Sequence, residues 1–260
     1  MTKIKNKEEK ENHLIEEMFK LGAHFGYNKS RRHPSVKSYI FTTKNKVDII
    51  DLEKTDNLLV EAKNFVKKLG EERKQILFVG TKAEAKKIVQ ENAQEINFPF
   101  VNTRWIGGTF TNFSEIKKRI DRLETLRKEK VGGLLDKYTK KEYLVIDGEI
   151  KKLETFFSGI VIMQKLPEAI LVVDVKHEEI AVTEANKVRI PVIGIANSDC
   201  DIKNIDYPIV ANDSSASSIE FFIKELIKSY KEGQENPVSK DQKDIKKENK
   251  TADFLETNIE

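Results

Sequence analysis

The chain has 260 residues, of which 46 are Lys or Arg and 43 are Asp or Glu, so its formal net charge is only +3. Charged residues make up 34% of the sequence, and no apolar run reaches the roughly 18 residues of a membrane-spanning helix, which excludes a protein of that class. The single Cys200 excludes an internal disulfide or a multi-cysteine zinc site, and the mixed charges of residues 1–20 fit neither a signal nor a transit peptide, so we expect a soluble cytoplasmic protein.

The first part of the chain contains signals for a helix, an extended segment and a second helix. Apolar residues at helical spacing in 14–21 predict an amphipathic opening helix, and residues 39–51 have an extended pattern. Thr55 and Asp56 are candidate caps for a second amphipathic helix, which Gly70 would end.

Short apolar runs then alternate with amphipathic helices. This alternation is typical of a parallel β-sheet covered by helices on both faces, so the predicted fold class is α/β. The predicted strands lie near 76–79, 100–102, 170–174, 192–195 and 208–210, and the predicted helices at 83–94, 178–188 and 214–230.

The alternation is interrupted between residues 113 and 165. Two apolar stripes on charged helices, at 116–126 and 143–157, are separated by Gly132-Gly133, which predicts a protruding, coiled-coil-like helical hairpin. Beyond Tyr230 there is little to bury, which predicts a disordered tail. The predicted organisation is an α/β domain at 1–112 and 166–230, a helical hairpin at 113–165 and a tail at 231–260.

Positive charge is concentrated in two places, although the total is small. The window from Met18 to Val47 contains no acidic residue, and we call its part from 22 to 47 the basic loop. Region 117–141 has ten basic residues against four acidic ones, whereas 231–260 has six Lys against eight acidic residues. The near-neutral sum therefore conceals two basic surfaces, because local fields depend on where the charges lie.

An α/β enzyme is the alternative interpretation, since such sheets place catalytic groups just after their strands. Asp174, His177 and Asp199 would be its candidate residues. Phosphate-loop motifs are absent from the sequence, and Gly80-Thr81-Lys82 lacks the second glycine that such a loop needs. The acidic residues of 199–206 could bind a cation, but turn chemistry explains them more simply, and the four histidines lack the spacing of a metal pair. We expect no catalytic residue, metal or cofactor.

The basic loop combines cations and aromatic rings with Gly and Pro, which fix an irregular backbone. Guanidinium and ammonium groups neutralise phosphates, and aromatic rings can stack on exposed bases. We expect Phe25 and Phe41 to pack into the core instead, which leaves the cations as the RNA-binding groups. These candidates are Lys29, Arg31, Arg32, Lys37 and Lys44.

A second segment, residues 102–113, follows a predicted strand and leads into the predicted hairpin. Its two glycines permit close backbone approach, and amides at a helix start can hold a phosphate. Alternatively, residues 102–113 simply cap a helix above a buried Trp105, and the charged residues of the hairpin form a solvated surface. The candidates here are Arg104, Gly107, Gly108, Thr109, Thr111 and Asn112, followed in the hairpin by Lys117, Lys118, Arg119 and Arg122.

A series of short motifs, ordered along residues 10–230, resembles one known family, the bacterial type of small-subunit ribosomal protein two. No single motif is decisive, but the series is specific. Its members include His24-Phe25-Gly26, Tyr39-Ile40-Phe41, Ile49-Ile50-Asp51-Leu52-Glu53-Lys54-Thr55, Phe78-Val79-Gly80-Thr81-Lys82, Asn102-Thr103-Arg104-Trp105-Ile106-Gly107-Gly108-Thr109, Val172-Val173-Asp174 and Asn212-Asp213.

The resemblance implies a flavodoxin-like α/β sandwich with a protruding helical hairpin. It implies a structural protein without catalytic activity that binds small-subunit rRNA near the head–body junction of a cytoplasmic ribosome. The implied partners are neighbouring ribosomal proteins, including the large one that captures messenger RNA, and we expect neither a membrane nor a homo-oligomer. The sequence departs from the family pattern at Tyr27, where a second His is common, and at Arg32-His33, where Trp-Asn is usual. The first change keeps a ring and the second adds charge, so RNA binding remains the expectation.

Overall fold

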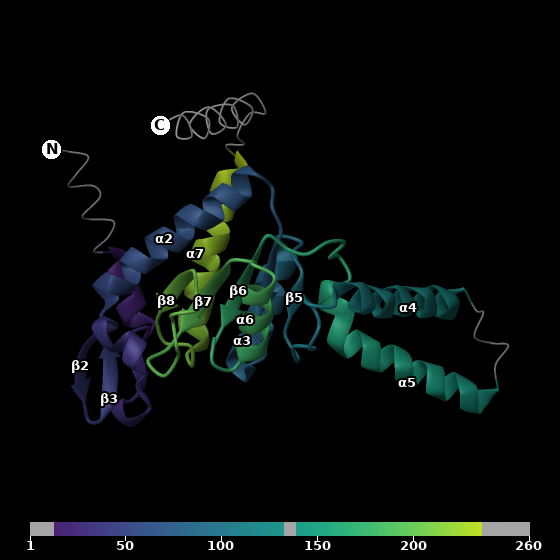
Figure 1. Cartoon of the computed structure of the whole chain (residues 1–260), viewed down its shortest axis with the longest axis horizontal. Helices are drawn as coiled ribbons and strands as arrows, with labels where there is room; N and C mark the ends of the chain where they lie inside the picture. Colours follow the sequence, from purple (N-terminus) through teal and green to yellow (C-terminus); the bar gives the residue numbers. More distant parts are fainter. Residues whose placement is uncertain (1–12, 133–138, 236–260) are drawn as a thin grey trace, which may run out of the picture.

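The body of the molecule is built on a five-stranded parallel sheet, seen in a computed structural model that describes residues 13–132 and 139–235 (Figure 1). The strand order is β5-β4-β6-β7-β8, so the direction in which strands are added reverses between β4 and β6. The strands are β4 (Ile76–Val79), β5 (Phe100–Val101), β6 (Ala169–Val173), β7 (Val192–Ala196) and β8 (Tyr207–Val210).

Helices cover both faces of this sheet. Alternate residues of a strand point to opposite layers, so Ile76 and Phe78 join a core cluster with α2, α3 and α7, while Leu77 and Val79 join one with α4 and α6. Both faces are apolar because both are covered. The predicted α/β class is thereby confirmed. The helices are α2 (Leu52–Glu71), α3 (Ala83–Glu95), α4 (Phe113–Val131), α5 (Lys140–Phe157), α6 (Glu179–Lys187) and α7 (Ala216–Glu235).

Parts of the basic loop, together with residues 48–50, form a second, three-stranded antiparallel sheet, which sequence reasoning did not resolve. Its strands are β1 (Phe25–Asn28), β2 (Ile40–Lys44) and β3 (Val47–Ile50), in the order β1-β3-β2. A two-residue turn joins β2 to β3, and both of its residues, Asn45 and Lys46, have positive φ. Such turns match the twist of the flanking strands. The extended pattern of 39–51 is therefore mostly a β-hairpin.

Two helix boundaries differ from the predictions. Helix α2 begins at Leu52, and its cap is Asp51, whose carboxylate accepts hydrogen bonds from Glu53 N and Lys54 N. Thr55 lies inside the helix, where its hydroxyl donates to Val210 O at 2.6 Å. At the other end of the chain, α7 continues to Glu235, which shortens the predicted tail.

Helices α4 and α5 pack together and project from the body (Figure 1). Their contact buries Leu123, Leu126 and Ile150. The predicted division into domains remains a prediction. Residues 1–12, 133–138 and 236–260, which belong to the predicted α/β domain, hairpin and tail, lie outside the described residues. Among the helices that the structure describes, none has a stretch long and apolar enough to cross a bilayer.

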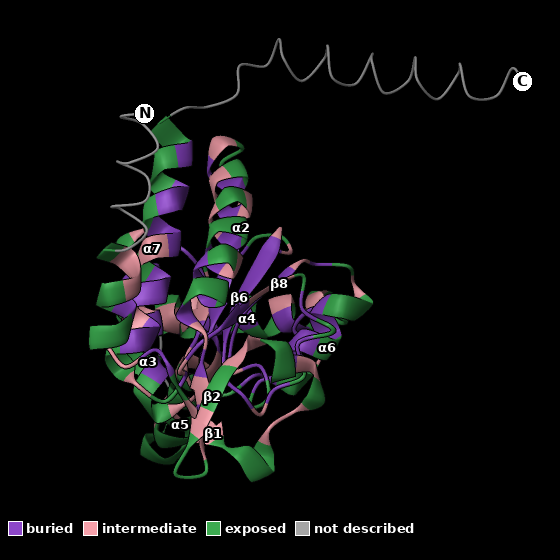
Figure 2. Cartoon of the chain, turned by 90° about the vertical axis from the view of Figure 1, so that its left-hand side faces the viewer, coloured by how far each residue is buried: buried purple, intermediate pink, exposed green. Residues whose placement is uncertain are grey.

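Helices α2 and α7 extend together beyond the sheet (Figure 2), and they approach each other most closely at Gly70 and Gly233. A Cβ added at Gly233 would fall far inside contact distance of Lys67 O on α2, and one added at Gly70 would do the same with Tyr230 O on α7. The rigid backbone cannot retreat as a flexible side chain could. Gly70 therefore does not end α2 but permits its closest approach to α7.

We expect Gly233→Ala to lower the free energy of unfolding by about 1–3 kcal/mol, because the added methyl forces the two helices apart. The matched control is Gly148→Ala in α5, where a new Cβ meets nothing within 4 Å. There the better helix propensity of alanine should raise stability by about 0.5–1 kcal/mol. Urea unfolding followed by circular dichroism measures both. Equal effects of the two substitutions would contradict the close crossing.

Candidate nucleic-acid interface

Four of the five cations predicted in the basic loop point outward. Lys29 and Arg31 belong to a 3-10 turn that Asn28 caps, Lys37 lies in a second 3-10 turn and Lys44 ends β2. All four are exposed, and none has an ion pair among the described residues. Their charges are therefore available to an external anion.

Arg32 differs from that prediction, because its guanidinium is directed inward. Its Nε donates to Asp48 Oδ2 at 2.6 Å, and its Nη2 donates to Thr43 Oγ1 at 2.6 Å and to Asp48 Oδ1. Asp48 is fully buried. Burial opposes its charge, but the Arg32 hydrogen bonds outweigh this and hold the pKa of the carboxyl below its usual value. Arg32 thus stabilises the β2–β3 hairpin and has little charge to offer a phosphate.

The aromatic rings of the basic loop also differ from the prediction that they pack into the core. Phe25 is 50% exposed and Phe41 is 74% exposed. Both lie on the small antiparallel sheet rather than on the parallel sheet, whose faces the helices cover. Trp105, by contrast, is buried as expected.

The backbone amides of the second segment, which were expected to hold a phosphate, are occupied by Glu184 of α6. Its Oε1 accepts from Gly108 N at 2.7 Å and from Trp105 Nε1 at 3.3 Å. Its Oε2 accepts from Phe110 N at 3.0 Å and from Thr111 N and Oγ1, each at 3.3 Å. An internal carboxylate therefore takes the place that the prediction gave to an external phosphate.

The ionised form of Glu184 fits these donors. Burial opposes ionisation, but the amides of Gly108, Phe110 and Thr111 outweigh it and hold the pKa of Glu184 below its usual value. The sequence carries a weak signal for this role, since Glu184 lies among the buried Ala181, Val182 and Ala185 of α6. A charged residue on the buried stripe of a helix needs internal partners.

The side chains of the second segment divide into buried and exposed groups. Thr109 is buried, and its hydroxyl donates to Ile106 O at 2.6 Å. Arg104, Gly107 and Asn112 are exposed, and Arg104 has no ion pair among the described residues. Of the predicted ligands here, Arg104 and Asn112 are those that can reach a partner with a side chain.

Acidic partners cancel much of the positive charge of α4. Lys117 and Arg119 have no ion pair within the described ranges, whereas Lys118 and Arg122 do, so fewer cations of α4 are available to an external anion than the sequence alone suggests. The pairs are Lys118–Glu115 at 2.6 Å, Arg122–Glu149 at 3.4 Å, Arg127–Glu154 at 2.9 Å and Lys130–Asp147 at 2.6 Å.

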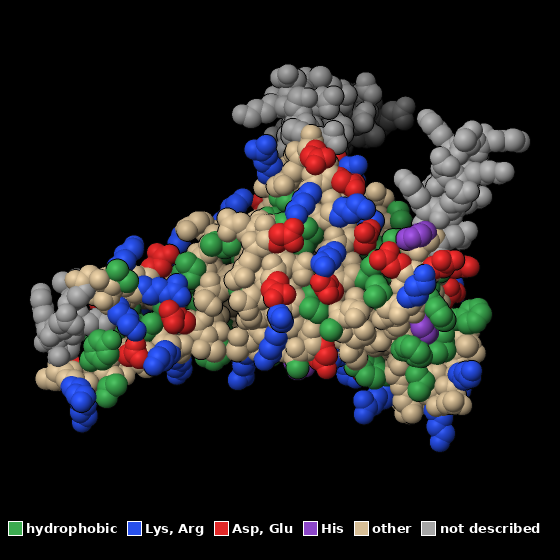
Figure 3. Space-filling model, turned by 180° about the vertical axis from the view of Figure 1, so that it is seen from behind, with side chains coloured by type: hydrophobic (Ala, Val, Ile, Leu, Met, Phe, Trp, Pro, Cys, Tyr) green, Lys and Arg blue, Asp and Glu red, His purple; other side chains and the backbone are tan. Residues whose placement is uncertain are grey.

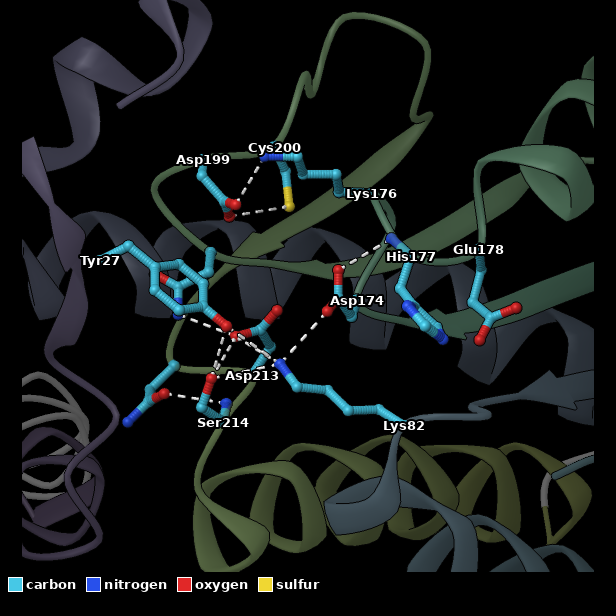
Figure 4. A network of polar contacts seen from close by, with 12 residues as sticks. Tyr27, Lys82, Asp174, Lys176, His177, Glu178, Asp199, Cys200, Asp213 and Ser214 are labelled. Atoms are coloured by element: carbon cyan, nitrogen blue, oxygen red, sulfur yellow. Dashed lines mark hydrogen bonds and ion pairs between the residues drawn. The ribbon is translucent and has the colours of Figure 1, made fainter. Parts of the chain in front are cut away.

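Of the strand-end residues of the enzyme alternative, Asp174 and Asp199 have internal partners for their side chains, whereas His177 is exposed and contributes its backbone N–H (Figure 4). Lys82 reaches into the end of the sheet, where its Nζ lies 3.2 Å from Asp174 Oδ2 and 3.4 Å from Asp213 Oδ1 and donates to Tyr27 Oη at 3.1 Å. Asp174 also accepts from His177 N at 3.0 Å. Lys82, which follows β4, thus pairs with Asp174, which follows β6, at the sheet edge where α/β enzymes bind ligands.

The turn after β4 is filled in a related way. Thr81 N and Thr81 Oγ1 donate to Glu178 Oε1 at 3.0 and 2.5 Å. Two glutamates, Glu178 just before α6 and Glu184 within it, therefore accept the hydrogen bonds of the N–H groups in the two glycine-containing turns. These N–H groups are the ones that could otherwise have bound an anion. Gly80-Thr81-Lys82 therefore forms a strand-to-helix turn between β4 and α3, which fits the absence of a phosphate-loop motif there.

The acidic residues of 199–206 mostly serve local structure. Asp199 pairs with Lys176 at 2.9 Å, Asp201 accepts from Lys203 N at 3.1 Å, and Asp206 accepts from Val192 N at 2.8 Å. Within the described residues, the group that could approach a metal ion is Asp174, Cys200 and Asp213. The Lys82 ammonium already places a positive charge beside the carboxylates of Asp174 and Asp213.

The charged surface follows from these pairings. In Figure 3, Lys and Arg side chains project from the lower edge of the molecule, both from the two-helix projection at the left and from the end that holds the small antiparallel sheet at the right. Hydrophobic side chains are exposed at this second end. The exposed cations of the basic loop, unpaired within the described residues, lie near the exposed ring of Phe25 and are suited to binding a polyanion that also presents flat aromatic groups.

Comparison with known proteins identifies relatives over most of the chain. The family model described as Ribosomal protein S2 matches residues 18–233. A protein of Salinibacter ruber named small ribosomal subunit protein uS2 is 45% identical over 230 residues, which are 88% of this chain and 72% of that protein. Proteins of the same name from Karelsulcia muelleri and Hahella chejuensis are each 42% identical over 215 residues, 83% of this chain, and these matches cover 97% and 85% of the two proteins.

Proposed function

Because the chain belongs to the ribosomal protein S2 family, we propose that it binds small-subunit rRNA through phosphate contacts of its basic loop. Its role in the small ribosomal subunit is structural, and through that subunit it serves translation. In this proposal it binds near the head–body junction of the subunit and has no catalytic activity of its own.

The observation that carries the proposal is the contrast between the two kinds of cation in the basic loop. Arg32 is satisfied internally, whereas Lys29, Arg31, Lys37 and Lys44 are exposed and unpaired within the described residues. The exposed ammonium and guanidinium groups of these four residues can neutralise an external polyanion. RNA supplies that anion as a regular series of phosphates.

The other predicted ligands have smaller parts in this proposal. Arg104, Asn112, Lys117 and Arg119 extend the contact toward α4, because they remain exposed or unpaired within the part of the chain that the structure describes. Lys118 and Arg122 would have to leave their glutamate partners first. We therefore place the centre of the interface on the basic loop and its edge on the two projecting helices.

The remaining surfaces are proposed to meet protein. The partners would be neighbouring small-subunit proteins, including the large one that captures messenger RNA, on cytoplasmic ribosomes. In this proposal the protein does not form a homo-oligomer and does not contact a membrane.

The test measures how binding to small subunits stripped of this protein depends on salt. Each phosphate contact contributes roughly 0.7–0.9 to the slope of log affinity against log salt, so Lys29→Gln with Arg31→Gln should reduce that slope by about 1.4–1.8. Arg32→Gln is the matched control, and we expect it to lower the melting temperature while the slope stays near that of the natural chain. A double variant with an unchanged slope would remove the basic loop from the interface.

A further inference from the structure

Three aromatic rings form a stack at the start of β1. The Phe19 and His24 rings are 4.3 Å apart between centroids and nearly parallel, at 12°. The His24 and Phe25 rings are 4.1 Å apart and tilted by 39°. Phe19 comes from the helix over residues 13–20, so the stack joins that helix to the small sheet.

The stack is open on its outer members. Phe19 is 59% exposed and Phe25 is 50% exposed, whereas the His24 between them is buried. Two large rings exposed on either side of His24 are costly, because each could remove apolar surface from water by moving inward. Here His24 holds them in place, and burial lowers the pKa of His24, which keeps the middle ring uncharged.

The cations of the basic loop lie at the far end of the same strand. Strand β1 runs from Phe25 to Asn28, and Lys29 and Arg31 follow directly. Four residues of strand span roughly 13 Å. The Lys29 amide also donates to Lys46 O at 2.8 Å, which brings the β2–β3 turn to this end. One short strand thus has exposed rings at one end and exposed cations at the other.

This combination is the one that proteins use to hold unpaired nucleotides. Cations contact the sugar–phosphate backbone, while aromatic faces stack on bases without regard to their sequence. A protein partner could also cover two phenylalanines, but it would not need cations on the same strand. The charges next to the rings favour RNA.

We propose that Phe19 and Phe25 form a stacking platform for unpaired nucleotides of the rRNA that the basic loop contacts. The platform rests on the proposed function, since it positions bases of an RNA whose phosphates Lys29 and Arg31 hold. It adds a contact of a different physical kind, because stacking releases no counterions and the affinity it contributes does not depend on salt in the same way.

The test uses a single-stranded RNA of twelve nucleotides carrying 2-aminopurine, whose emission falls when the base stacks on a ring, and a duplex of the same length. We expect Phe19→Leu with Phe25→Leu to weaken binding of the single strand about 5- to 100-fold, to restore the emission of bound 2-aminopurine and to leave the salt slope unchanged. Binding of the duplex should change little. Leucine keeps an apolar side chain, and melting temperatures establish that the variants fold.

The matched control is Phe41→Leu, a more exposed ring with no described ring partner, which should change neither affinity nor emission. If the phenylalanine pair has no effect while Lys29→Gln with Arg31→Gln still reduces the slope, the platform is wrong and the proposed function stands. If neither variant alters RNA binding, the proposed function fails as well. An unchanged RNA affinity together with lost binding of a neighbouring ribosomal protein to the subunit would reassign the rings to protein and overturn the platform.

Discussion

Replacing Lys82 by Met is expected to lower the free energy of unfolding by about 3–5 kcal/mol at neutral pH. The reason is that Asp174 and Asp213 would then face each other without the ammonium that separates them. Removing one partner of a buried ion pair is costly because the other charge stays buried and uncompensated. Asp213 is the more severe case, since it is fully buried and its Oδ2 has no hydrogen-bond partner in the structure. Urea unfolding measures the loss.

The pH dependence of this loss has a definite sign. Burial, together with the charge of Asp174, already raises the pKa of Asp213, so this group favours the folded state most when it is protonated. Without Lys82 that pKa rises further. The penalty of Lys82→Met should therefore shrink as the pH falls toward the usual carboxyl range, and Asp213→Asn in the same background should recover part of it at pH 7.

The control for this prediction is Lys86, in the first turn of helix α3, which Lys82 immediately precedes. Lys86 is exposed and has no ion pair among the described residues, so Lys86→Met should change stability by less than about 0.5 kcal/mol. A Lys82→Met variant as stable as the natural chain would mean that the two carboxylates do not need their shared cation.

The main sheet was predictable because its signal is local. A run such as Ile76–Val79 is apolar at every position, as a strand buried on both faces requires, and runs such as 76–79 and 169–173 are followed by a helical stripe. The small sheet was not predictable in this way. Its strands alternate irregularly, with Asp48 buried and Phe41 exposed, so the pattern of 39–51 indicated an extended chain but neither its partner nor its faces.

The candidate site was predicted less well, because sequence shows which charges exist but not which of them meet. Arg31 and Arg32 are neighbours of identical chemistry, yet one is exposed and the other is fixed by a carboxylate 16 positions later. In helix α4, Arg122 and Arg127 are exposed cations by sequence, but α5 contributes Glu149 and Glu154 as their ion-pair partners. Pairs formed by tertiary contact, distant in sequence, decide which cations remain for RNA.

Glu184 makes another long-range connection, which joins α6 to a segment more than 70 residues earlier in the chain. We expect Glu184→Gln to lower the free energy of unfolding by about 2–3 kcal/mol. Hydrogen bonds to a charged acceptor contribute about 1.5–3 kcal/mol, and an amide side chain replaces one accepting oxygen by a donor that faces the same buried N–H groups. Trp105 is the chain's single tryptophan and donates to this carboxylate, so its emission should shift as well.

The dependence on pH separates a charged Glu184 from one that merely fills space. Because its folded-state pKa lies below the usual value, its stabilising effect is present above the unfolded pKa near 4.5 and is lost as the pH falls through the folded value. The difference between the natural chain and Glu184→Gln should therefore be largest at neutral pH and shrink below about pH 4.5. Glu179→Gln, an exposed change on the same helix, should leave both stability and Trp105 emission unaltered. A stability difference that stays constant down to pH 3 would show that the shape of the Glu184 side chain, and not its ionised carboxylate, holds the 105–111 segment in place. The N–H groups of this segment would then be able to bind an external phosphate in place of Glu184.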